Sequence, residues 1–543
     1  MKHRSAVAMS VLAAAAALTA CAEVPTPEPQ RPASAPPVST SAPVAEAPPA
    51  PPARWARVYQ RSCTGSITEP LLSTDGKSVA SCGTRFDVER GRFLGTAPFG
   101  LLALLEGDRA IVDEFGEGGL TLVSPGGNTV RDAGGRPLSI AIAGDEKRVV
   151  SLEKSNDGER LVVVRALPSL ARESATSLGR GPAEGSVGLL ADGRVVVHAS
   201  HPCIEAACEG DAAKDASCKQ MKCSGHGLFV IDRGAVTPLV AGVRAAGFGA
   251  RGDVAAIVRD DGSAALIALP DGRVLAPLPP VGMDDVDEVA VSAAGDRVAI
   301  GSFKKLSVLA KSGAGFVEVL ATTDARVQML RFSADGRMLF TGHNLAAYRE
   351  GAEPRALPVP AYDMKLPEGF VKAARKDDAW MLPNEGERAV GEGDLAMFVD
   401  PKMGAEVVVS AIDADELDPS GDAETWGKRV ATRLLSPHVA LDTAAALKKV
   451  GFVAWGEPGH RSLELHWMSH GCEDVDSYER VSEKGGAVVR VHIQVYGEMT
   501  AKKIAPWLDA FFDDPLGKSP ARAGHARAPT KPKAAHKPKA RKR

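Results

Sequence analysis

The stretch SADGRMLFTG at residues 333–342 carries the pattern that decides the fold. A polar turn containing Asp335 and Gly336 is followed at once by the apolar run Met338–Phe340. Asp and Gly favour tight turns because they tolerate backbone conformations that other residues avoid. Short apolar runs bounded by such turns are typical of β-strands. The stretch therefore predicts a short strand that begins directly after a tight turn.

Turns of this kind recur between residues 60 and 360, and most are followed by a second turn and a second strand. The seven copies begin TDGKSVASCG (74), EGDRAIVDEFG (106), GDEKRVVSLEK (144), ADGRVVVHAS (191), ARGDVAAIVR (250), AAGDRVAIGS (293) and ADGRMLFTGH (334). Their spacing is about 40 residues, apart from a gap of roughly 60 after the fourth copy, and this period is typical of propeller blades.

One four-stranded blade cannot bury both of its faces, whereas blades stacked around an axis do so and protect the sheet edges. We therefore predict a mainly β protein in which residues 55–365 form a seven-bladed β-propeller. The segments that begin at 191 and 334 resemble the inner-strand motif of WD-repeat and YVTN-type propellers. No Trp lies between residues 56 and 379, so the Trp-Asp signature of WD repeats is absent. A pair of β-sandwiches is the alternative fold.

Residues 201–226, HPCIEAACEGDAAKDASCKQMKCSGH, hold four cysteines spaced C-x4-C-x9-C-x4-C. The segment replaces a hairpin turn of the fourth repeat, so we predict an insertion in the fourth blade. Its interior has moderate helix propensity, which favours a hairpin of two helical turns. The symmetric spacing favours nested disulfides that staple the loop, Cys203 with Cys223 and Cys208 with Cys218. A zinc site and a redox centre are the alternatives, although the spacing is wide for zinc and C-x-x-C is absent.

Three further cysteines follow the apolar start of the chain. Cys63 and Cys82 bracket the first repeat, and their flanking segments are predicted as neighbouring strands. We therefore expect a third disulfide between them, because an exported chain meets an oxidising compartment. Cys472 is then left as a buried thiol or an intermolecular partner.

The N-terminus, MKHRSAVAMSVLAAAAALTAC, places basic residues before an apolar run of about 14 residues, which is too short for a comfortable membrane span. The sequence Leu18-Thr19-Ala20-Cys21 resembles the lipobox of bacterial lipoproteins. The resemblance implies that residues 1–20 are a signal peptide and that Cys21 is acylated. Ala22 stands where retained lipoproteins carry Asp, which implies the outer membrane of a Gram-negative envelope. An ordinary secretory signal is the alternative.

Two segments have compositions that cannot bury a core. Residues 21–54 contain 11 prolines and are predicted as an extended linker. Residues 516–543 carry ten Lys or Arg and no acid, so the net charge of −3 for the whole chain leaves −13 for the rest. We expect this disordered tail either to be a solvated terminus or to contact anionic envelope surfaces rather than nucleic acid. Its most basic part comprises Lys531, Lys533, Lys537, Lys539, Arg541, Lys542 and Arg543.

Residues 370–515 are predicted as a smaller α+β domain, in which helices pack on one face of a sheet. DLAMFVD, GAEVVVSAI, GFVAWGE, RSLELHWMSH and GAVVRVHIQVYGE are predicted as strands. DAETWGKRVATRLL is predicted as a helix capped by Asp422, with further helices at 442–450 and in TAKKIAPWLDAFFDD. The order of these elements resembles the small α/β/α sandwich of the oxygen-evolving-complex P-subunit family.

Three short motifs contain residue types that carry chemistry. GFGARG at 247–252 matches a dinucleotide-binding pattern, but strands on both sides predict an inter-blade turn. DADELDPSGD at 413–422 lacks the EF-hand spacing, so we predict a solvated loop that caps the next helix. His466, His470 and Cys472 are a weak alternative metal site beside a strand whose polar face is expected to be wet.

These features predict a cell-envelope lipoprotein, anchored to the membrane through Cys21. Its expected role is non-enzymatic binding or scaffolding of another envelope protein or polymer, without a cofactor and without catalytic residues. Propellers also host enzymes, so a propeller hydrolase or lyase with acids near the central channel is the alternative.

Overall fold

The computed structural model describes residues 53–496 with gaps, of which the longest are 62–68, 208–218, 356–367 and 436–450. The predicted signal peptide, linker and basic tail lie outside the described residues. The described chain is mainly β, with one α-helix and one short 3-10 helix, η1 (Glu106–Asp108). Within it, no helix combines the length and apolar character needed to cross a membrane.

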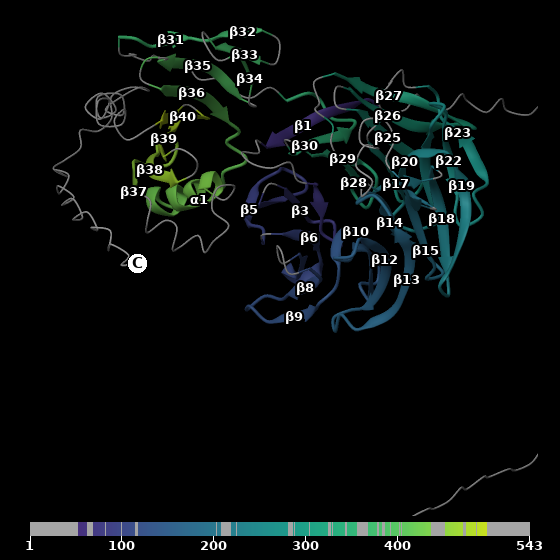
Figure 1. The fold of residues 1–543 in the computed structure, drawn as a ribbon. Helices are drawn as coiled ribbons and strands as arrows, with labels where there is room; N and C mark the ends of the chain where they lie inside the picture. The colour runs from purple at the N-terminus through teal and green to yellow at the C-terminus, as the bar shows by residue number, and fades with distance from the viewer. Residues whose placement is uncertain are drawn as a thin grey trace, which may run out of the picture. The chain divides into compact units, whose positions relative to one another are not determined.

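Seven four-stranded antiparallel sheets confirm the predicted seven-bladed β-propeller (Figure 1). Blade 1 contains β2 (Leu71–Leu72), β3 (Ser78–Ser81), β4 (Thr84–Asp87) and β5 (Phe93–Thr96). Blade 2 contains β6 (Leu101–Leu104), β7 (Ala110–Val112), β8 (Leu120–Val123) and β9 (Thr129–Asp132). Blade 3 contains β10 (Arg136–Ile142), β11 (Arg148–Lys154), β12 (Glu159–Ala166) and β13 (Arg172–Arg180). Blade 4 contains β14 (Ser186–Leu189), β15 (Val195–Ser200), β18 (His226–Asp232) and β19 (Ala235–Ala241).

The remaining blades follow the same order. Blade 5 contains β20 (Val243–Phe248), β21 (Val254–Arg259), β22 (Ala264–Ala268) and β23 (Val274–Pro277). Blade 6 contains β24 (Glu288–Val291), β25 (Arg297–Ser302), β26 (Lys305–Ser312) and β27 (Gly315–Thr322). Blade 7 contains β28 (Leu330–Phe332), β29 (Met338–Thr341), β30 (Leu345–Glu350) and β1 (Trp55–Arg61). First strands of successive blades lie side by side, as β6 with β10 and β20 with β24 do.

A strand from the start of the propeller closes the ring. β1 pairs antiparallel with β30, from Trp55 opposite Glu350 to Arg61 opposite Leu345, and it forms the outer strand of blade 7 (Figure 1). Trp55, Tyr59 and Arg61 are buried. Because the first and last strands of the propeller share one sheet, the ring cannot open without breaking this ladder.

The repeated turn lies between the first and second strands of each blade. In blade 7, the amide of Gly336 donates to the carbonyl of Ser333 at 2.9 Å, and Gly336 has a φ of 71°. Such a backbone is costly for a residue with a Cβ. Gly76, Gly193, Gly252 and Gly295 hold positive φ angles in the corresponding turns of blades 1, 4, 5 and 6. This requirement explains why Gly recurs in the sequence pattern.

The motif GFGARG is the corresponding turn of blade 5. β20 ends at Phe248 and β21 begins at Val254, so the prediction of strands on both sides is confirmed. The prediction of an inter-blade turn is wrong, because the two strands belong to one sheet. In each blade this turn joins the first strand to the second. The spacing between the sequence copies does not show whether such a turn lies within a blade or between two blades.

Buried side chains between neighbouring blades form the propeller core. Phe86 of blade 1 packs in one cluster with Phe340 of blade 7, and Val196 of blade 4 packs with Ile257 of blade 5. Burying a side chain of this size contributes roughly 1.5–3 kcal/mol. Each blade therefore depends on its neighbours, as the repeat predicts.

The C-terminal region is built on a seven-stranded sheet with the order β31-β35-β36-β40-β39-β38-β37. These strands are β31 (Val371–Lys372), β35 (Asp394–Asp400), β36 (Ala405–Ile412), β37 (Gly451–Trp455), β38 (Ser462–His470), β39 (Asp474–Lys484) and β40 (Ala487–Tyr496). A second, three-stranded sheet contains β32 (Ala374–Lys376), β33 (Ala379–Leu382) and β34 (Gly386–Ala389). The five strands predicted for this region are present, whereas β31, β39 and the three strands of the second sheet are additional.

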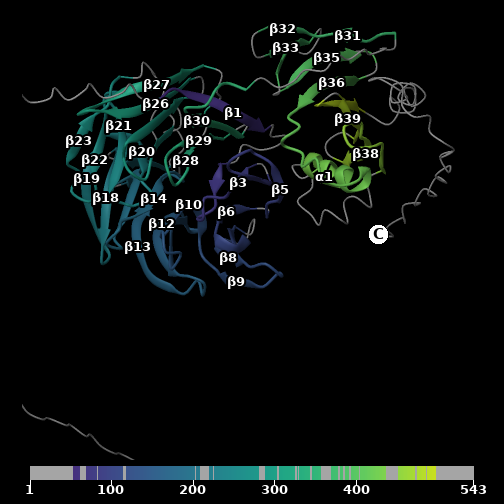
Figure 2. The same cartoon turned by 180° about the vertical axis from the view of Figure 1, so that it is seen from behind.

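Helix α1 (Ala423–Leu435) confirms the predicted helix and its cap. The amide of Thr425 donates to Oδ1 of Asp422 at 2.8 Å. Trp426 and Val430 pack against Leu463 of β38 and Val481 of β39, so α1 covers one face of the sheet (Figure 2). The helices predicted at 442–450 and near the C-terminus lie outside the described residues.

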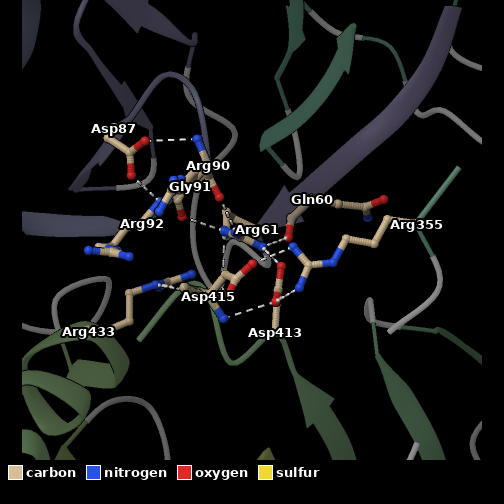
Figure 3. A network of polar contacts seen from close by, with 11 residues as sticks. Gln60, Arg61, Asp87, Arg90, Gly91, Arg92, Arg355, Asp413, Asp415 and Arg433 are labelled. Atoms are coloured by element: carbon tan, nitrogen blue, oxygen red, sulfur yellow. Dashed lines mark hydrogen bonds and ion pairs between the residues drawn. The ribbon is translucent and has the colours of Figure 1, made fainter. Parts of the chain in front are cut away.

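The C-terminal region is joined to the propeller by a network of ion pairs in which Arg61, Asp413 and Glu416 are buried (Figure 3). Nη1 of Arg61 lies 3.2 Å from Oδ2 of Asp413, and Arg355 lies 3.3 Å from the other oxygen of that carboxylate. Glu416 accepts a hydrogen bond from Arg433 of α1, and its backbone carbonyl accepts one from the amide of Phe93 in β5 at 2.9 Å. Residues from 50 onward cluster as one compact unit, so a separate α+β domain is not confirmed.

The prediction of a solvated loop at 413–422 is wrong for its first half. Asp413 is 4% exposed and Glu416 is 7% exposed. The Asp413 carboxylate faces Arg61 of β1 and Arg355, which are far away in the sequence. The Glu416 carboxylate faces Arg433 of the helix that follows. Local composition shows the acids but not these partners, which allow the acids to be buried.

Candidate functional site

The insertion in blade 4 is a β-hairpin at its base. Of the interior that is predicted to form two helical turns, Ala206, Ala207 and Lys219 lie in its two strands instead, and residues 208–218 lie outside the described residues. β16 (Cys203–Ala207) pairs antiparallel with β17 (Lys219–Cys223), from Cys203 opposite Cys223 to Ala207 opposite Lys219. The two strands directly follow β15 and precede β18, which pair with each other up to Ser200 and His226. The parent hairpin places both arms in an extended, paired geometry that outweighs moderate helix propensity. The predicted position of the insertion is confirmed.

A disulfide joins Cys203 to Cys223 across the first pair of this ladder, with a Cα–Cα distance of 4.0 Å. This is the outer of the two nested bonds that the cysteine spacing favours. The inner partners, Cys208 and Cys218, lie outside the described residues. Closing a loop of 20 residues contributes about 3 kcal/mol by the chain-entropy model. The hairpin base is therefore held both by a ladder and by a covalent bond.

Polar side chains gather where the hairpin leaves the blade. Oγ of Ser200, which is only 2% exposed, donates to Oε1 of Glu184 at 3.0 Å. His226 lies opposite Ser200 in the ladder, and both of its ring nitrogens are 3.2 Å from this Oγ. Nε2 of His226 is also 3.5 Å from Glu184. One carboxylate thus contacts both the hydroxyl and the imidazole.

Two further histidines flank this group. Nε2 of His198 is 2.9 Å from the carbonyl of Val243, and the His198 ring centroid is 6.1 Å from that of His226. Burial lowers the pKa of His198, so the ring is neutral at neutral pH. Nδ1 of His201 is 3.1 Å from the carbonyl of Leu178, and its ring meets Phe229 edge-on at 5.2 Å. The hairpin base is therefore flanked by His198 and His201, whose rings contact backbone carbonyls, and by the aromatic ring of Phe229.

A buried arginine from the neighbouring blade completes the group. Arg160 of β12 is 0% exposed, and its Nη2 lies 3.5 Å from Sγ of Cys203. A Cβ built on Gly181 would lie 2.2 Å from Cζ of Arg160, so the guanidinium packs directly against this glycine. Burial lowers the pKa of Arg160, and the nearby Glu184 opposes that shift. The base of the hairpin thus contacts a buried guanidinium group.

The contacts of Ser200 differ from those of a catalytic relay. Ser, His and Glu are the residue types of a nucleophilic hydrolase, in which the base takes the hydroxyl proton and the acid orients the base. Here Ser200 donates directly to Glu184, which places the carboxylate on the hydroxyl as well as on His226. No group of three His, Cys, Asp or Glu side chains within the described ranges has the geometry to hold a metal ion.

The other predicted site residues are placed only in part. His466 of β38 stacks on Tyr478 with ring centroids 4.2 Å apart, and its Nε2 lies 3.4 Å from Asp476. His470 ends β38, but its side chain is outside the description, as is Cys472. The acylation candidate Cys21 and the disulfide candidates Cys63 and Cys82 also lie outside it, so these assignments stay predictions.

Sequence reasoning missed the polar group at the hairpin base. Ser200 directly precedes the cysteine segment and His226 is its last residue, which is a local signal for both. Arg160 and Glu184 come from β12 and from the segment before β14, and the propeller brings them to the hairpin. No spacing rule in the sequence indicates these two neighbours.

A comparison with known proteins adds no functional assignment. No family model matches the chain, and no curated protein matches it.

Proposed function

We propose that this chain is a lipid-anchored protein of the cell envelope that binds another envelope protein or polymer without catalysing a reaction. The disulfide-linked hairpin of blade 4 is its main contact element. The observation that carries this proposal is the hairpin itself, a covalently closed excursion from an otherwise regular blade. A covalent bond across the base of a loop reduces the conformational freedom that the loop loses on binding.

The order of segments supports presentation of the propeller at a distance from a membrane. The proposed lipid attachment at Cys21 is followed by a Pro-rich linker up to residue 54, and β1 begins at Trp55. The tether therefore enters the propeller at the strand that closes the ring. The basic tail supports a second, electrostatic contact with an anionic surface.

The proposal is tested by cross-linking in intact cells that express the full chain. One variant replaces residues 202–224 by an Asn-Gly turn, and the control replaces residues 155–158, the β11–β12 turn of blade 3, by the same dipeptide. We expect partners cross-linked to the wild type and to the control to be lost from the hairpin variant. Identical partners for all three proteins would contradict the assignment of the hairpin.

An enzyme is the second candidate, and the contacts among Ser200, His226 and Glu184 favour it over other sites in the described residues. A hydrolase that uses this group loses activity toward ester or peptide substrates in the Ser200→Ala variant. We expect no such activity in the wild type. Turnover that is abolished both by Ser200→Ala and by His226→Ala would replace the binding proposal.

A further inference from the structure

We propose that the Cys203–Cys223 disulfide is a reducible bond and that Arg160 sets its reduction potential by stabilising the thiolate of Cys203. The hairpin base would then have an oxidised form with this covalent bond and a reduced form without it. The chemistry of this bond is independent of what the hairpin binds.

Arg160 occupies an unusual place for a guanidinium group. It is fully buried, and its Nε and Nη1 have no hydrogen-bond partner in the part of the chain that the structure describes. Its Nη2 points at Sγ of Cys203, 43 positions away in the sequence. Gly181 leaves room for the planar group at this spot. The geometry thus directs a buried cation at one sulfur of the disulfide.

The free-energy cost of burying Arg160 differs between the oxidised and the reduced form of the disulfide. A buried cation without a close anion is costly, and a neutral disulfide sulfur compensates it only weakly. Reduction places a thiolate at the same position, where a neighbouring Arg lowers the thiol pKa. A thiolate stabilised in this way raises the potential, so the bond becomes easier to reduce. The lowered pKa of Arg160, which reflects burial, agrees with a charge that lacks compensation.

The other charged group near Arg160 is Glu184, which opposes this effect by attracting the same cation. Its carboxylate is half exposed, and it is already engaged with Ser200 and His226. Solvent screening weakens an exposed charge much more than a buried one. Among the described residues, Nη2 of Arg160 therefore faces the sulfur of Cys203 rather than a buried carboxylate.

The reaction is a thiol–disulfide exchange with a dithiol reductant. A thiolate of the reductant attacks Sγ of Cys223, the Cys203–Cys223 bond breaks, and Cys203 leaves as a thiolate beside Arg160. The second thiol of the reductant then attacks the mixed disulfide and forms the oxidised, cyclic reductant. Cys223 leaves as a thiolate and takes up a proton. The dithiol loses two electrons and the protein disulfide gains two.

The experiment measures the equilibrium between the oxidised and reduced pair in the full chain, in buffers of reduced and oxidised dithiothreitol. Differential alkylation and peptide sequencing by mass spectrometry resolve Cys203 and Cys223 from the other cysteines. The variants are Arg160→Met, which removes the charge, and Gly181→Ala, which displaces the guanidinium. Arg160→Lys retains the charge, and Arg180→Met removes an exposed charge from the same blade.

We expect Arg160→Met and Gly181→Ala to make the bond at least about tenfold harder to reduce, which corresponds to roughly 30 mV for two electrons. Arg160→Lys should keep most of the wild-type potential, and Arg180→Met should leave it unchanged. If the equilibrium constants of Arg160→Met and Gly181→Ala both lie within twofold of the wild-type constant, the proposal is overturned.

A measurement on the reduced wild-type chain keeps the inference testable if the variants do not fold. The pH dependence of iodoacetamide labelling gives the pKa of the Cys203 thiol. We expect a pKa at least about one unit below the usual value near 8.5. A pKa of 8.5 or higher would overturn the role of Arg160.

Discussion

Arg61 shows how one side chain can serve both ring closure and attachment of the C-terminal region. It ends β1, donates to the carbonyl of Gly91 at 2.7 Å, and pairs with Asp413 at 3.2 Å (Figure 3). Its side chain is 1% exposed, and that of Asp413 is 3% exposed. A charge pair this deeply buried is sensitive to the loss of either partner, because the remaining charge stays desolvated.

We therefore expect Arg61→Met to lower the free energy of unfolding by about 3–5 kcal/mol, since Asp413 loses a buried partner. Chemical denaturation of the full chain measures this change. Arg57→Met, at an exposed position of the same strand, is the control and should change stability by less than about 0.5 kcal/mol. Equal effects of the two variants would show that the ion network contributes nothing.

The lowered pKa of Glu479 leads us to expect that the folded protein loses stability in acid. Burial raises its pKa, but Arg490 and His492 outweigh burial and lower it from 4.5 to about 2. The folded state therefore binds the proton less tightly than the unfolded state. The stability that results is present above pH 4.5 and is lost as the pH falls toward 2.

Between pH 4.5 and 2, we expect the wild type to lose roughly 3 kcal/mol more unfolding free energy than Glu479→Gln, in which this titration is absent. Denaturation at a series of pH values measures the difference. Glu424→Gln, on the exposed face of α1, is the matched control and should follow the wild type. A wild-type slope equal to that of Glu479→Gln would contradict the prediction.

At the scale of elements, β1 is the part of the propeller most separated from its partners along the chain. It pairs with β30, almost 300 residues later, and buries Trp55 and Tyr59 against blades 6, 7 and 1. A chain that begins at residue 53 keeps this strand, whereas a chain that begins at residue 62 leaves blade 7 with an unpaired edge.

We expect the chain from residue 53 to unfold at the temperature of the chain from residue 22. The chain from residue 62 should unfold at least about 10 °C lower or aggregate, because an open sheet edge invites association. Thermal unfolding followed by circular dichroism compares the three. Equal midpoints for the chains from 53 and 62 would show that β1 does not close the ring.

The sequence predicts those strands and turns whose residues have the polarity expected for their position, apolar where they are buried and polar where they are exposed. The seven turns and the strands after them are identified because the positive φ of Gly336 and its counterparts is a local requirement. β39 is missed because DVDSYERVSEK has the composition of a surface segment. Within the sheet, Glu479 is buried against Arg490 of the next strand, and this pairing makes the polar strand compatible with the interior. The hairpin base is missed for the same reason, since Arg160 reaches Cys203 only through the packing of blades.

At the scale of the whole molecule, the proposed function needs a tether at one end of the chain and a contact element on blade 4. In this proposal the lipid at Cys21 and the Pro-rich linker hold the propeller near a membrane, and the hairpin contacts the partner. This organisation makes attachment and binding separable properties, each with its own variant.

We expect Cys21→Ser to move the protein from the membrane fraction to the soluble fraction of cells, because acylation at this position is lost. Fractionation and immunoblotting measure the distribution. The hairpin replacement at 202–224 should stay in the membrane fraction. A Cys21→Ser protein that remains membrane-bound would contradict the lipid anchor, while leaving the hairpin proposal untouched.

The most direct test of the central claim is the affinity of the purified chain, from residue 22 onward, for the partner recovered by cross-linking. Isothermal titration should show binding by the wild type and by the blade 3 control at 155–158. The replacement of residues 202–224 should weaken binding at least about 100-fold, or about 2.7 kcal/mol. An unchanged affinity in the hairpin variant would contradict the assignment of blade 4 as the binding element.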